Sequence, residues 1–493
     1  MLSGPPPPVP RRPRVNRDVL WSALEAIGAA IFSVAAAFVI ARMIGPSELG
    51  IGATAVAVHV LLWVAVNALF ADAIVQRDTI DDPTLSSAAW ASCIVGCGAA
   101  VIQAGSGWLL AWMLSDPRLI PMALLLALPL PFVGMGGALQ GLLTRRKRYR
   151  ALAARTLVGQ GAGMVVGITL ASRDAGAWAP VVQQLTGSLL SALVLICVAG
   201  WRPRLVCHWP AVRSLLRIGL PLTASTMLMI GRYRVFAILI GGTAGATALG
   251  QVHVAFRLVD TVREITFTAM WRLMLPILSE HQHDTAALRR QVDRLLLLSS
   301  AVAMPLCGGL ALALVPVTGL ILGPTWHAAG VAAEPLVALM VLLSLMFPSG
   351  AALVAVGKAR FTLYANLAGV TMTVVFVLLF QPATPWDAVL VWCGAQVFVS
   401  PYSMWVNGRA LGAGLLRPLR AGVPMLLISA AGVAAAMALD AGSPVEALLR
   451  RAGVFILVLV VCGVPWLWSL RTGSFGGRDE TAGDDPLVSG RSS

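Results

Sequence analysis

Long runs of apolar residues, separated by short polar connections, fill almost the whole chain. Each run is long enough to cross a membrane as a helix. In lipid an open strand edge would leave backbone groups unpaired, so the β-branched residues in these runs do not predict strands. The pattern predicts an all-α integral membrane protein with about fourteen transmembrane helices. The runs lie at about 20–42, 49–74, 88–114, 119–143, 152–171, 179–200, 217–241, 247–278, 293–322, 330–355, 361–380, 386–406, 423–440 and 451–470.

The composition agrees with this pattern. Hydrophobic residues make up 58% of the 493 residues, charged residues only 12%, and the mean hydropathy is +0.82. These values exclude a soluble multi-domain enzyme and a disordered chain. The net charge of +14 is typical of basic cytoplasmic loops, so we do not expect nucleic-acid binding. An odd number of cysteines, seven in all, argues against a disulfide framework.

The positions of the basic residues predict the topology. If the N-terminus is cytoplasmic, the inner segments hold 26 Lys and Arg residues and the outer ends hold 5. This split predicts an even number of spans with both termini in the cytoplasm. The densest cluster, at Arg145–Arg150, is expected to contact anionic membrane lipids.

Two sequence echoes indicate an internal repeat. The segment Ile40–Gly50 is echoed by Ile238–Gly250, and Lys147–Leu152 is echoed by Lys358–Leu363, at offsets of 200 and 211 residues. The echoes occupy matching places in two blocks of six helices. This duplication predicts two pseudo-symmetric six-helix bundles around a central cavity, as in transporters that work by alternating access.

The polar segments divide the chain between and around these bundles. The run at 20–42 is too long for a signal peptide, so we expect it to be retained. The predicted parts are a basic, proline-rich cytoplasmic tail (1–19), the N-terminal bundle (20–200), an interfacial linker (201–217), the C-terminal bundle (218–406), helices 13 and 14 (407–470) and a disordered cytoplasmic tail (471–493).

Charged residues inside the predicted spans indicate where a substrate binds. A charge at the bilayer centre costs about 2.5–3.5 kcal/mol, so it is expected to face a cavity or a partner. His253, Arg257, Asp260 and Glu264 repeat along one helical face. The arginines within the spans outnumber the acids, which predicts a cationic interior suited to a phosphate-bearing substrate. These arginines are Arg232, Arg234, Arg257, Arg263 and Arg272, against the acids Glu25, Asp260 and Glu264.

Other interpretations of these charges stay open. Arg257 could form a structural ion pair with Asp260 or Glu264, and Arg272 could extend to the interface. No metal or cofactor is expected: His281 and His283 lack a third ligand, the chain has no P-loop, and no catalytic arrangement stands in a large loop. The protein is therefore not expected to be an enzyme.

The segment Ala41–Gly50, followed by Ala73–Arg77, resembles a signature of the Wzx-type polysaccharide flippases of the multidrug/oligosaccharidyl-lipid/polysaccharide exporter superfamily. Leu142–Leu152 resembles their loop after helix 4, and 177–203 resembles their helix 6. The resemblance covers about residues 18–410. It implies a multi-pass protein of the bacterial inner membrane that moves a polyprenyl-diphosphate-linked oligosaccharide between leaflets, driven by an ion gradient.

The resemblance also implies site residues and partners. By placement, Arg232, Arg234, Arg257 and Arg263 would bind the pyrophosphate in a cavity lined by helices 1, 2, 7 and 8. We expect a monomer that works beside a polysaccharide polymerase and co-polymerase. The four acids that could couple ions or pair charges are Glu25, Asp72, Asp260 and Glu264, and the predicted gate is Gly45 with Pro46.

One departure bears on ion coupling. Relatives often carry Asp-Leu-Gly-Leu near the end of helix 2, where this chain has Asn67–Phe70, so another acid such as Asp72 or Glu25 would be needed. Three rival functions remain: a drug/cation antiporter of the same superfamily, a membrane-embedded polysaccharide polymerase or ligase, and a non-transporting membrane scaffold, in which replacing the arginines within the spans would leave the phenotype intact. The first would favour an acidic cavity, and the second would need a large outer loop.

Overall fold

The computed structural model describes residues 15–77, 80–201, 203–206, 208–281, 284–356, 360–411, 417–439, 444–465 and 468. Within these ranges the chain forms helices and no strands. The helices are α1 (Val15–Gln76), α2 (Asp82–Leu114), α3 (Leu119–Ala127), α4 (Leu130–Arg145), α5 (Tyr149–Ala171), α6 (Trp178–Val198), α7 (Trp209–Thr243), α8 (Gly245–Glu280), α9 (Thr285–Leu322), α10 (His327–Ala355), α11 (Arg360–Phe380), α12 (Pro385–Leu411), α13 (Arg417–Met437) and α14 (Pro444–Val458), with short turns η1 (Pro324–Trp326) and η2 (Leu459–Gly463).

The predicted all-helical membrane fold is confirmed. Among the described residues the predicted apolar runs are mainly helical, and nine helices there are long and apolar enough to span a membrane. The number of fourteen spans stays a prediction. The tail predicted at 471–493 and most of that at 1–19 lie outside the described residues, as does Lys358 of the second echo. The segment predicted as a linker at 201–217 is helical from Trp209 onward.

One predicted boundary differs from the structure. The first two runs are two helical segments of α1 that meet, as predicted, at a sharp non-helical kink at Gly45 (φ +78°). The run at 119–143, by contrast, is broken between α3 and α4. Pro129 and Pro131 stand at this break and have no N–H to donate to the preceding turn, which explains the interruption.

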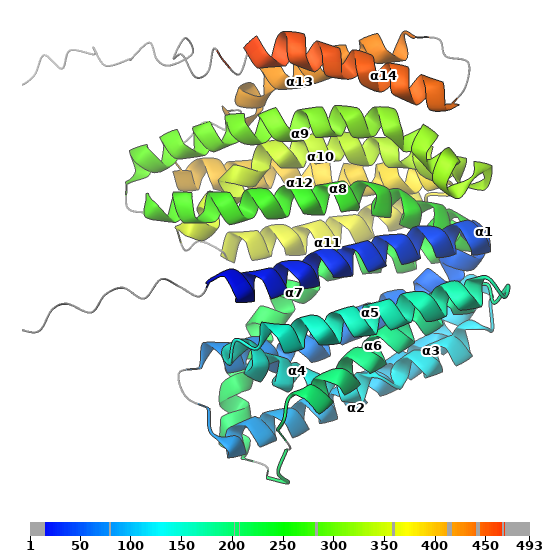
Figure 1. The fold of residues 1–493 in the computed structure, drawn as a ribbon, viewed down its shortest axis with the longest axis vertical. Coiled ribbons are helices and arrows are strands. Elements are labelled where there is room, and N and C mark those ends of the chain that lie inside the picture. Colours follow the sequence, from blue (N-terminus) through cyan, green and yellow to red (C-terminus); the bar gives the residue numbers. More distant parts are fainter. Residues whose placement is uncertain are drawn as a thin grey trace, which may run out of the picture.

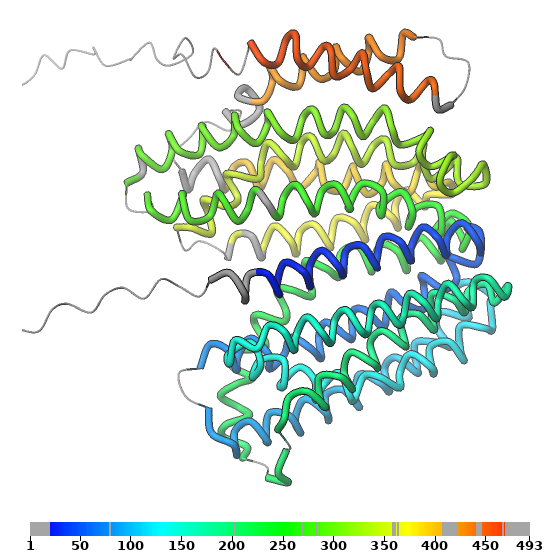
Figure 2. The backbone as a smooth tube through the Cα atoms, viewed as in Figure 1, coloured from blue at the N-terminus to red at the C-terminus, as the bar shows by residue number. Residues whose placement is uncertain are grey.

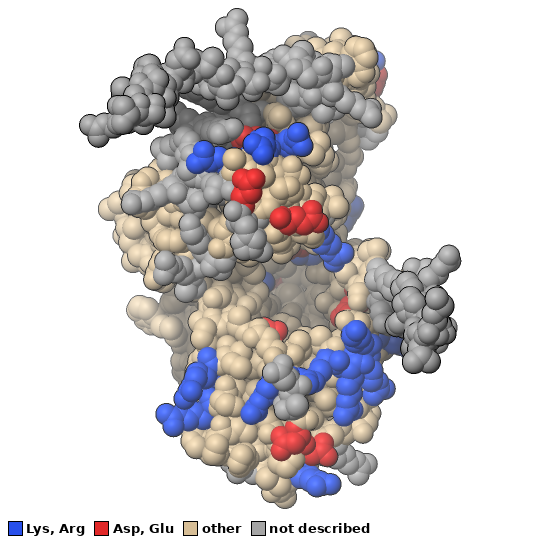
Figure 3. Space-filling model, turned by 90° about the vertical axis from the view of Figure 1, so that its left-hand side faces the viewer, with Lys and Arg blue, Asp and Glu red and all other residues tan. Residues whose placement is uncertain are grey.

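The helices form two lobes and a C-terminal pair (Figures 1 and 2). The N-terminal lobe contains α1–α6 and the C-terminal lobe contains α8–α12, with the first half of α1 lying between them. Helix α7 connects the lobes: its first half packs on α1 and α2, and its second half also contacts α8 and α11. Helices α13 and α14 pack on the outside of α9. We call the end of the bundle near Val15 the inner end, and the end near Gly45 and Gly245 the outer end. Seen from the inner end, the molecule is hollowed between the lobes (Figure 3).

The lobes meet closely at the outer end, in what we call the outer seam: Gly45, Pro46, Gly50, Ala246 and Gly250. Gly45 and Gly245, 200 residues apart, both adopt a left-handed backbone conformation, with φ of +78° and +82°. A methyl group added at Gly50 would overlap the carbonyl of Ala246, and one added at Gly250 would overlap the carbonyl of Pro46. The contact is therefore reciprocal, as expected for a duplicated unit.

Hydrogen bonds and ion pairs hold the kinked middle of α1 in place at the outer end. Glu48 accepts two hydrogen bonds from Arg118, at 3.0 and 3.1 Å, and a third from the Ala177 N–H at 2.7 Å. Arg118 also pairs with Asp116, and its hydrogen bonds keep the pKa of that carboxyl below its usual value. Across the lobes, Arg42 donates a hydrogen bond of 2.5 Å to the Ile321 carbonyl in the last turn of α9. A cation at a helix C-terminus is favourably placed.

We expect Gly50→Val and Gly250→Val to destabilise the protein, each by about 1–3 kcal/mol, because an added side chain must force the two backbones apart. The midpoint of thermal unfolding of the purified protein, followed by tryptophan fluorescence, measures this. Gly98→Val is the matched control, because a Cβ there would meet nothing within 4 Å. Equal midpoints for all three variants would contradict the reciprocal contact.

Candidate functional site

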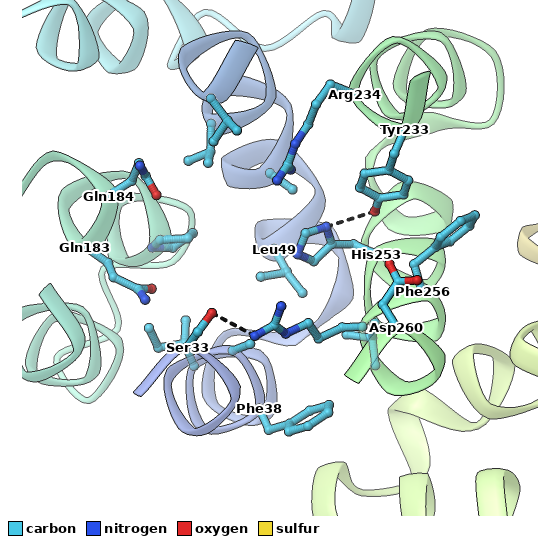
Figure 4. A pocket seen from close by; sticks show the side chains of 18 of the residues that line it. Ser33, Phe38, Leu49, Gln183, Gln184, Tyr233, Arg234, His253, Phe256 and Asp260 are labelled. Carbon is cyan, nitrogen blue, oxygen red and sulfur yellow. Dashed lines mark hydrogen bonds between the residues drawn. The ribbon is translucent and has the colours of Figure 1, made fainter. Parts of the chain in front are cut away.

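A cavity of about 290 Å³ lies between the lobes, beneath the outer seam. Its walls come from both halves of α1, from α6, and from α7 and α8. Figure 4 shows Gln183 and Gln184 on one side of this cavity and Arg234, Tyr233 and His253 on the other. We call it the interlobe cavity. Its N-terminal wall is neutral and polar, whereas its C-terminal wall carries the charges.

Two predicted arginines, Arg234 and Arg257, reach the interlobe cavity. Arg257 lies twelve residues into α8, which is about 18 Å from its outer end at 1.5 Å per residue. Its guanidinium donates a hydrogen bond of 2.7 Å to the hydroxyl of Ser33 on α1, and so connects the lobes. Its Nε is buried without a hydrogen-bond partner. Arg234, on α7, lines the cavity beside it.

Other polar side chains of the C-terminal wall, which α7 and α8 form, are bonded to one another. The hydroxyl of Tyr233 and Nδ1 of His253 lie 3.1 Å apart and form a hydrogen bond. Asp260 forms an ion pair of 2.8 Å with Arg263, one turn further along α8. The ion pair considered for Arg257 is therefore formed by Arg263, which does not line the interlobe cavity.

Arg232 lies elsewhere than expected. It lines an adjoining cavity of about 400 Å³ in the C-terminal lobe, together with Arg234 and Arg263. Its guanidinium donates a hydrogen bond of 2.5 Å to Oε1 of Gln396 on α12 and lies 5.3 Å from the ring centre of Trp392. Gly369 on α11 makes room for it, because a Cβ there would lie 2.9 Å from the guanidinium. The structure thus places Arg234 and Arg257 in the interlobe cavity, and Arg232, Arg234 and Arg263 in the second cavity.

The two cavities share their acids and keep a positive surplus. Asp260 and Glu264 line both cavities, along with Tyr233, Arg234 and Phe256. Together the two cavities hold four arginines and two carboxylates, so two positive charges are in excess. The ion pair between Asp260 and Arg263 is included in this count and does not change the excess of positive charge.

The remaining predicted residues lie outside these cavities. Glu25 accepts a hydrogen bond of 2.6 Å from Thr156 on α5 and lies near enough to Arg155 for their charges to attract. Asp72 and Arg272 are exposed. Gly45 and Pro46 belong to the outer seam. Gln282 and His283, in the loop considered for a metal, lie outside the described residues.

The sequence did not single out two polar residues that act at the site. Ser33 is an isolated serine in an apolar run, and nothing in its neighbours marks it as the partner of Arg257. Tyr233 stands between two arginines and could have been noticed as an aromatic group beside a candidate site.

A family model described as "Polysaccharide biosynthesis protein" matches residues 39–330, more than half of the chain. The chain belongs to the polysaccharide biosynthesis protein family. Its resemblance to polysaccharide exporters is thereby confirmed. The match includes both arginines of the interlobe cavity and the outer seam.

Two curated proteins resemble this member of the family. The succinoglycan biosynthesis transport protein ExoT of Rhizobium meliloti is 23% identical over 316 residues, which are 63% of each chain. The lipopolysaccharide biosynthesis protein WzxC of Escherichia coli is 23% identical over 352 residues, 69% of each chain. The match thus spans slightly less than two thirds of the length of ExoT.

Two solved structures share the fold of this polysaccharide biosynthesis protein. The lipid II flippase MurJ in an inward closed conformation matches with a TM-score of 0.76 at 12% identity, over 92% of this chain and all of that one. An inward-facing MATE family transporter of the MOP superfamily matches with a TM-score of 0.58 at 14% identity, over 86% of this chain and all of that one. The protein is a multi-pass bacterial membrane protein with a transporter fold.

We expect Arg232→Met to destabilise the protein by about 1–3 kcal/mol, because Gln396 and Trp392 lose the cation that they contact inside the C-terminal lobe. Thermal unfolding of the purified protein measures the change, and the exposed Arg272→Met is the matched control. A variant at position 232 as stable as the wild type would indicate that this guanidinium is not fixed within the lobe.

Proposed function

We propose that this protein flips a polyprenyl-diphosphate-linked oligosaccharide, such as an exopolysaccharide or O-antigen repeat unit, across the bacterial inner membrane. It is a transporter rather than an enzyme and works by alternating access. The observation that carries the proposal is the pair Arg234 and Arg257 in a cavity between two duplicated lobes. Membership in the polysaccharide biosynthesis family and similarity to a transport protein for succinoglycan biosynthesis support it.

The chemistry of the two walls suits such a cargo. A guanidinium binds phosphate oxygens through parallel hydrogen bonds and remains charged at any physiological pH. Gln183, Gln184 and Ser33 on the opposite wall offer the neutral donors and acceptors that sugar hydroxyls require. The interlobe cavity is smaller than a whole oligosaccharide, so it binds the diphosphate and the first sugar, while the prenyl chain stays in lipid.

Orientation and partners complete the proposal. The 26-to-5 split of basic residues supports a cytoplasmic inner end and cytoplasmic termini. The hollow at the inner end then opens to the leaflet in which the cargo is made (Figure 3). The protein acts as a monomer, contacts anionic lipids through its basic inner rim, and delivers cargo to a polysaccharide polymerase and co-polymerase.

Ion coupling is assigned to the acids of the C-terminal wall. Asp260 pairs with Arg263, whereas Glu264 lines both cavities and forms no ion pair among the described side chains. Glu264 is therefore the acid best placed to exchange a cation as the lobes move. Glu25 and Asp72 are less suitable, because neither lines the interlobe cavity. A drug/cation antiporter is the weaker candidate, since its cationic cargo would meet a surplus of arginine.

We expect Arg234→Ala and Arg257→Ala to lower the rate of flipping about tenfold or more, because each removes a charge-assisted contact to phosphate. Lipid-linked oligosaccharide should then accumulate on the cytoplasmic leaflet of cells that contain normal amounts of the protein. Arg257→Lys should give an intermediate rate, because it keeps the charge but loses the forked geometry. Export at the wild-type rate in both alanine variants, with Arg272→Ala as control, would refute the proposal.

The outer seam is the proposed gate on the periplasmic side. Release of the cargo requires the contacts of Gly50 and Gly250, and the bond from Arg42 to Ile321, to open together. Gly45 (φ +78°) is the hinge, because a side chain there would strain the bent backbone.

We expect Arg42→Gln to favour the outward-open state, because it weakens the bond to the α9 carbonyl that holds the lobes together. Val56 lines the interlobe cavity, so a cysteine placed there reports whether this cavity is open to the outside. With Arg42→Gln, this cysteine should react with a membrane-impermeant maleimide added outside several-fold faster than it does when Arg42 is present. The background lacks the native cysteines, and Arg173→Gln serves as the control. Unchanged labelling would show that Arg42 is not part of the gate.

A further inference from the structure

A third cavity, of about 430 Å³, lies at the inner end of the N-terminal lobe. It is formed by the starts of α1 and α5, the turn before α5, and the end of α6. Lys147, Arg148 and Arg150 stand at its rim, and all three are exposed. Figure 3 shows basic side chains gathered on one lobe at this end. We call this cavity the basic inner pocket.

The floor of the basic inner pocket is apolar. Ala151, Ala154 and Val198 line it, and the indole of Trp21 closes one side. The pocket therefore combines a cationic rim with a surface that an acyl or prenyl chain can cover. Tryptophan and arginine together are typical of the membrane interface, where an amphiphile places its head group.

The cations are held in position by the fold. The guanidinium carbon of Arg150 lies 5.7 Å from the ring centre of Trp21, a cation–π distance that joins α1 to α5. Arg148 donates a hydrogen bond of 3.5 Å to the carbonyl of Ala199 at the end of α6. Lys147 adopts a left-handed conformation (φ +53°), which glycine or asparagine would adopt more easily. The turn thus carries a cation at a position where the backbone favours a smaller residue.

No acid offsets this charge among the side chains that the structure describes. Neither Lys147, Arg148 nor Arg150 forms an ion pair there, and none of the residues that line the pocket is acidic. By contrast, Arg118 and Arg263 each have a carboxylate partner. An anion from outside the chain is the natural complement of three such cations.

We propose that the basic inner pocket binds the phosphate head group of a lipid in the inner leaflet. The phosphate accepts hydrogen bonds from Arg148 and Arg150 and is attracted by Lys147, while the first carbons of the chain lie on Ala151, Ala154 and Trp21. Both an anionic bilayer lipid and a prenyl diphosphate have this chemistry. The site is separate from the interlobe cavity. The inference rests on the orientation given under the proposed function and deepens its lipid contact, but it does not depend on cargo transport.

The test measures lipid binding to the purified full-length protein by native mass spectrometry. The probes are phosphatidylglycerol, undecaprenyl diphosphate and, as the neutral comparison, phosphatidylcholine. We expect the Arg148→Ala/Arg150→Ala double variant to bind at least one phosphate probe about tenfold or more weakly than the wild type, with phosphatidylcholine unchanged. If the double variant loses affinity for phosphatidylglycerol alone, the ligand is a bilayer lipid. If it loses affinity for undecaprenyl diphosphate, the ligand is prenyl-linked.

Two further variants keep the test decisive. Arg173→Ala/Arg272→Ala removes the same charge from exposed positions elsewhere and should bind all probes as the wild type does. Trp21→Ala should weaken lipid binding with the rim cations intact, whereas Trp21→Phe should weaken it less. The proposal is overturned if the Arg148/Arg150 variant, unfolding at the wild-type temperature, binds both phosphate lipids normally. Because this experiment measures lipid binding and not transport, normal lipid binding by the Arg148/Arg150 variant would leave the flippase proposal unaffected. Normal export by the Arg234 and Arg257 variants would likewise leave the lipid-binding proposal unaffected.

Discussion

A guanidinium group within the apolar thickness of a membrane requires polar surroundings, because leaving it against lipid costs several kcal/mol. This constraint determines where the arginines of the spans lie and which polar groups surround them. Arg257 is placed between the lobes, where Ser33 accepts one of its hydrogen bonds, and Arg234 lies beside it. The arginines inside the C-terminal lobe meet Gln396 and Asp260 instead. A cavity with unneutralised arginine is stable only if water or an anion enters it, which relates the fold directly to its cargo.

Duplication explains how such a cavity could open on one side at a time. The two halves present the same left-handed glycine, Gly45 and Gly245, and meet through Gly50 and Gly250 at the outer end. Because each half supplies the surface that the other needs, the outer seam closes through reciprocal contacts. In the proposed orientation, the hollow at the inner end and the basic inner pocket beside it lie on the side from which the proposed cargo arrives.

Much of the fold could be predicted from the sequence, because lipid permits few elements other than helices and the apolar runs mark them. The bend at Gly45 falls where the sequence predicted the junction of the first two spans, because Gly45 and Pro46 interrupt the apolar pattern there. The division of the arginines was in part predictable. Arg232 and Arg234 are two residues apart, about 200° around a helix, so only Arg234 faces the interlobe cavity, although both line the cavity of the C-terminal lobe. The contact of Arg257 with Ser33 was not predictable, since it joins residues distant in sequence through the packing of the lobes.

The most direct test of the central claim is a cryo-electron microscopy structure of the protein with undecaprenyl-diphosphate-linked sugar in a lipid nanodisc. The account predicts density for the diphosphate between the lobes, within hydrogen-bond distance of Arg234 and Arg257, with the prenyl chain leading into lipid. A diphosphate bound only outside the interlobe cavity, or side chains of Arg234 and Arg257 turned away from it toward acids or lipid, would contradict the account.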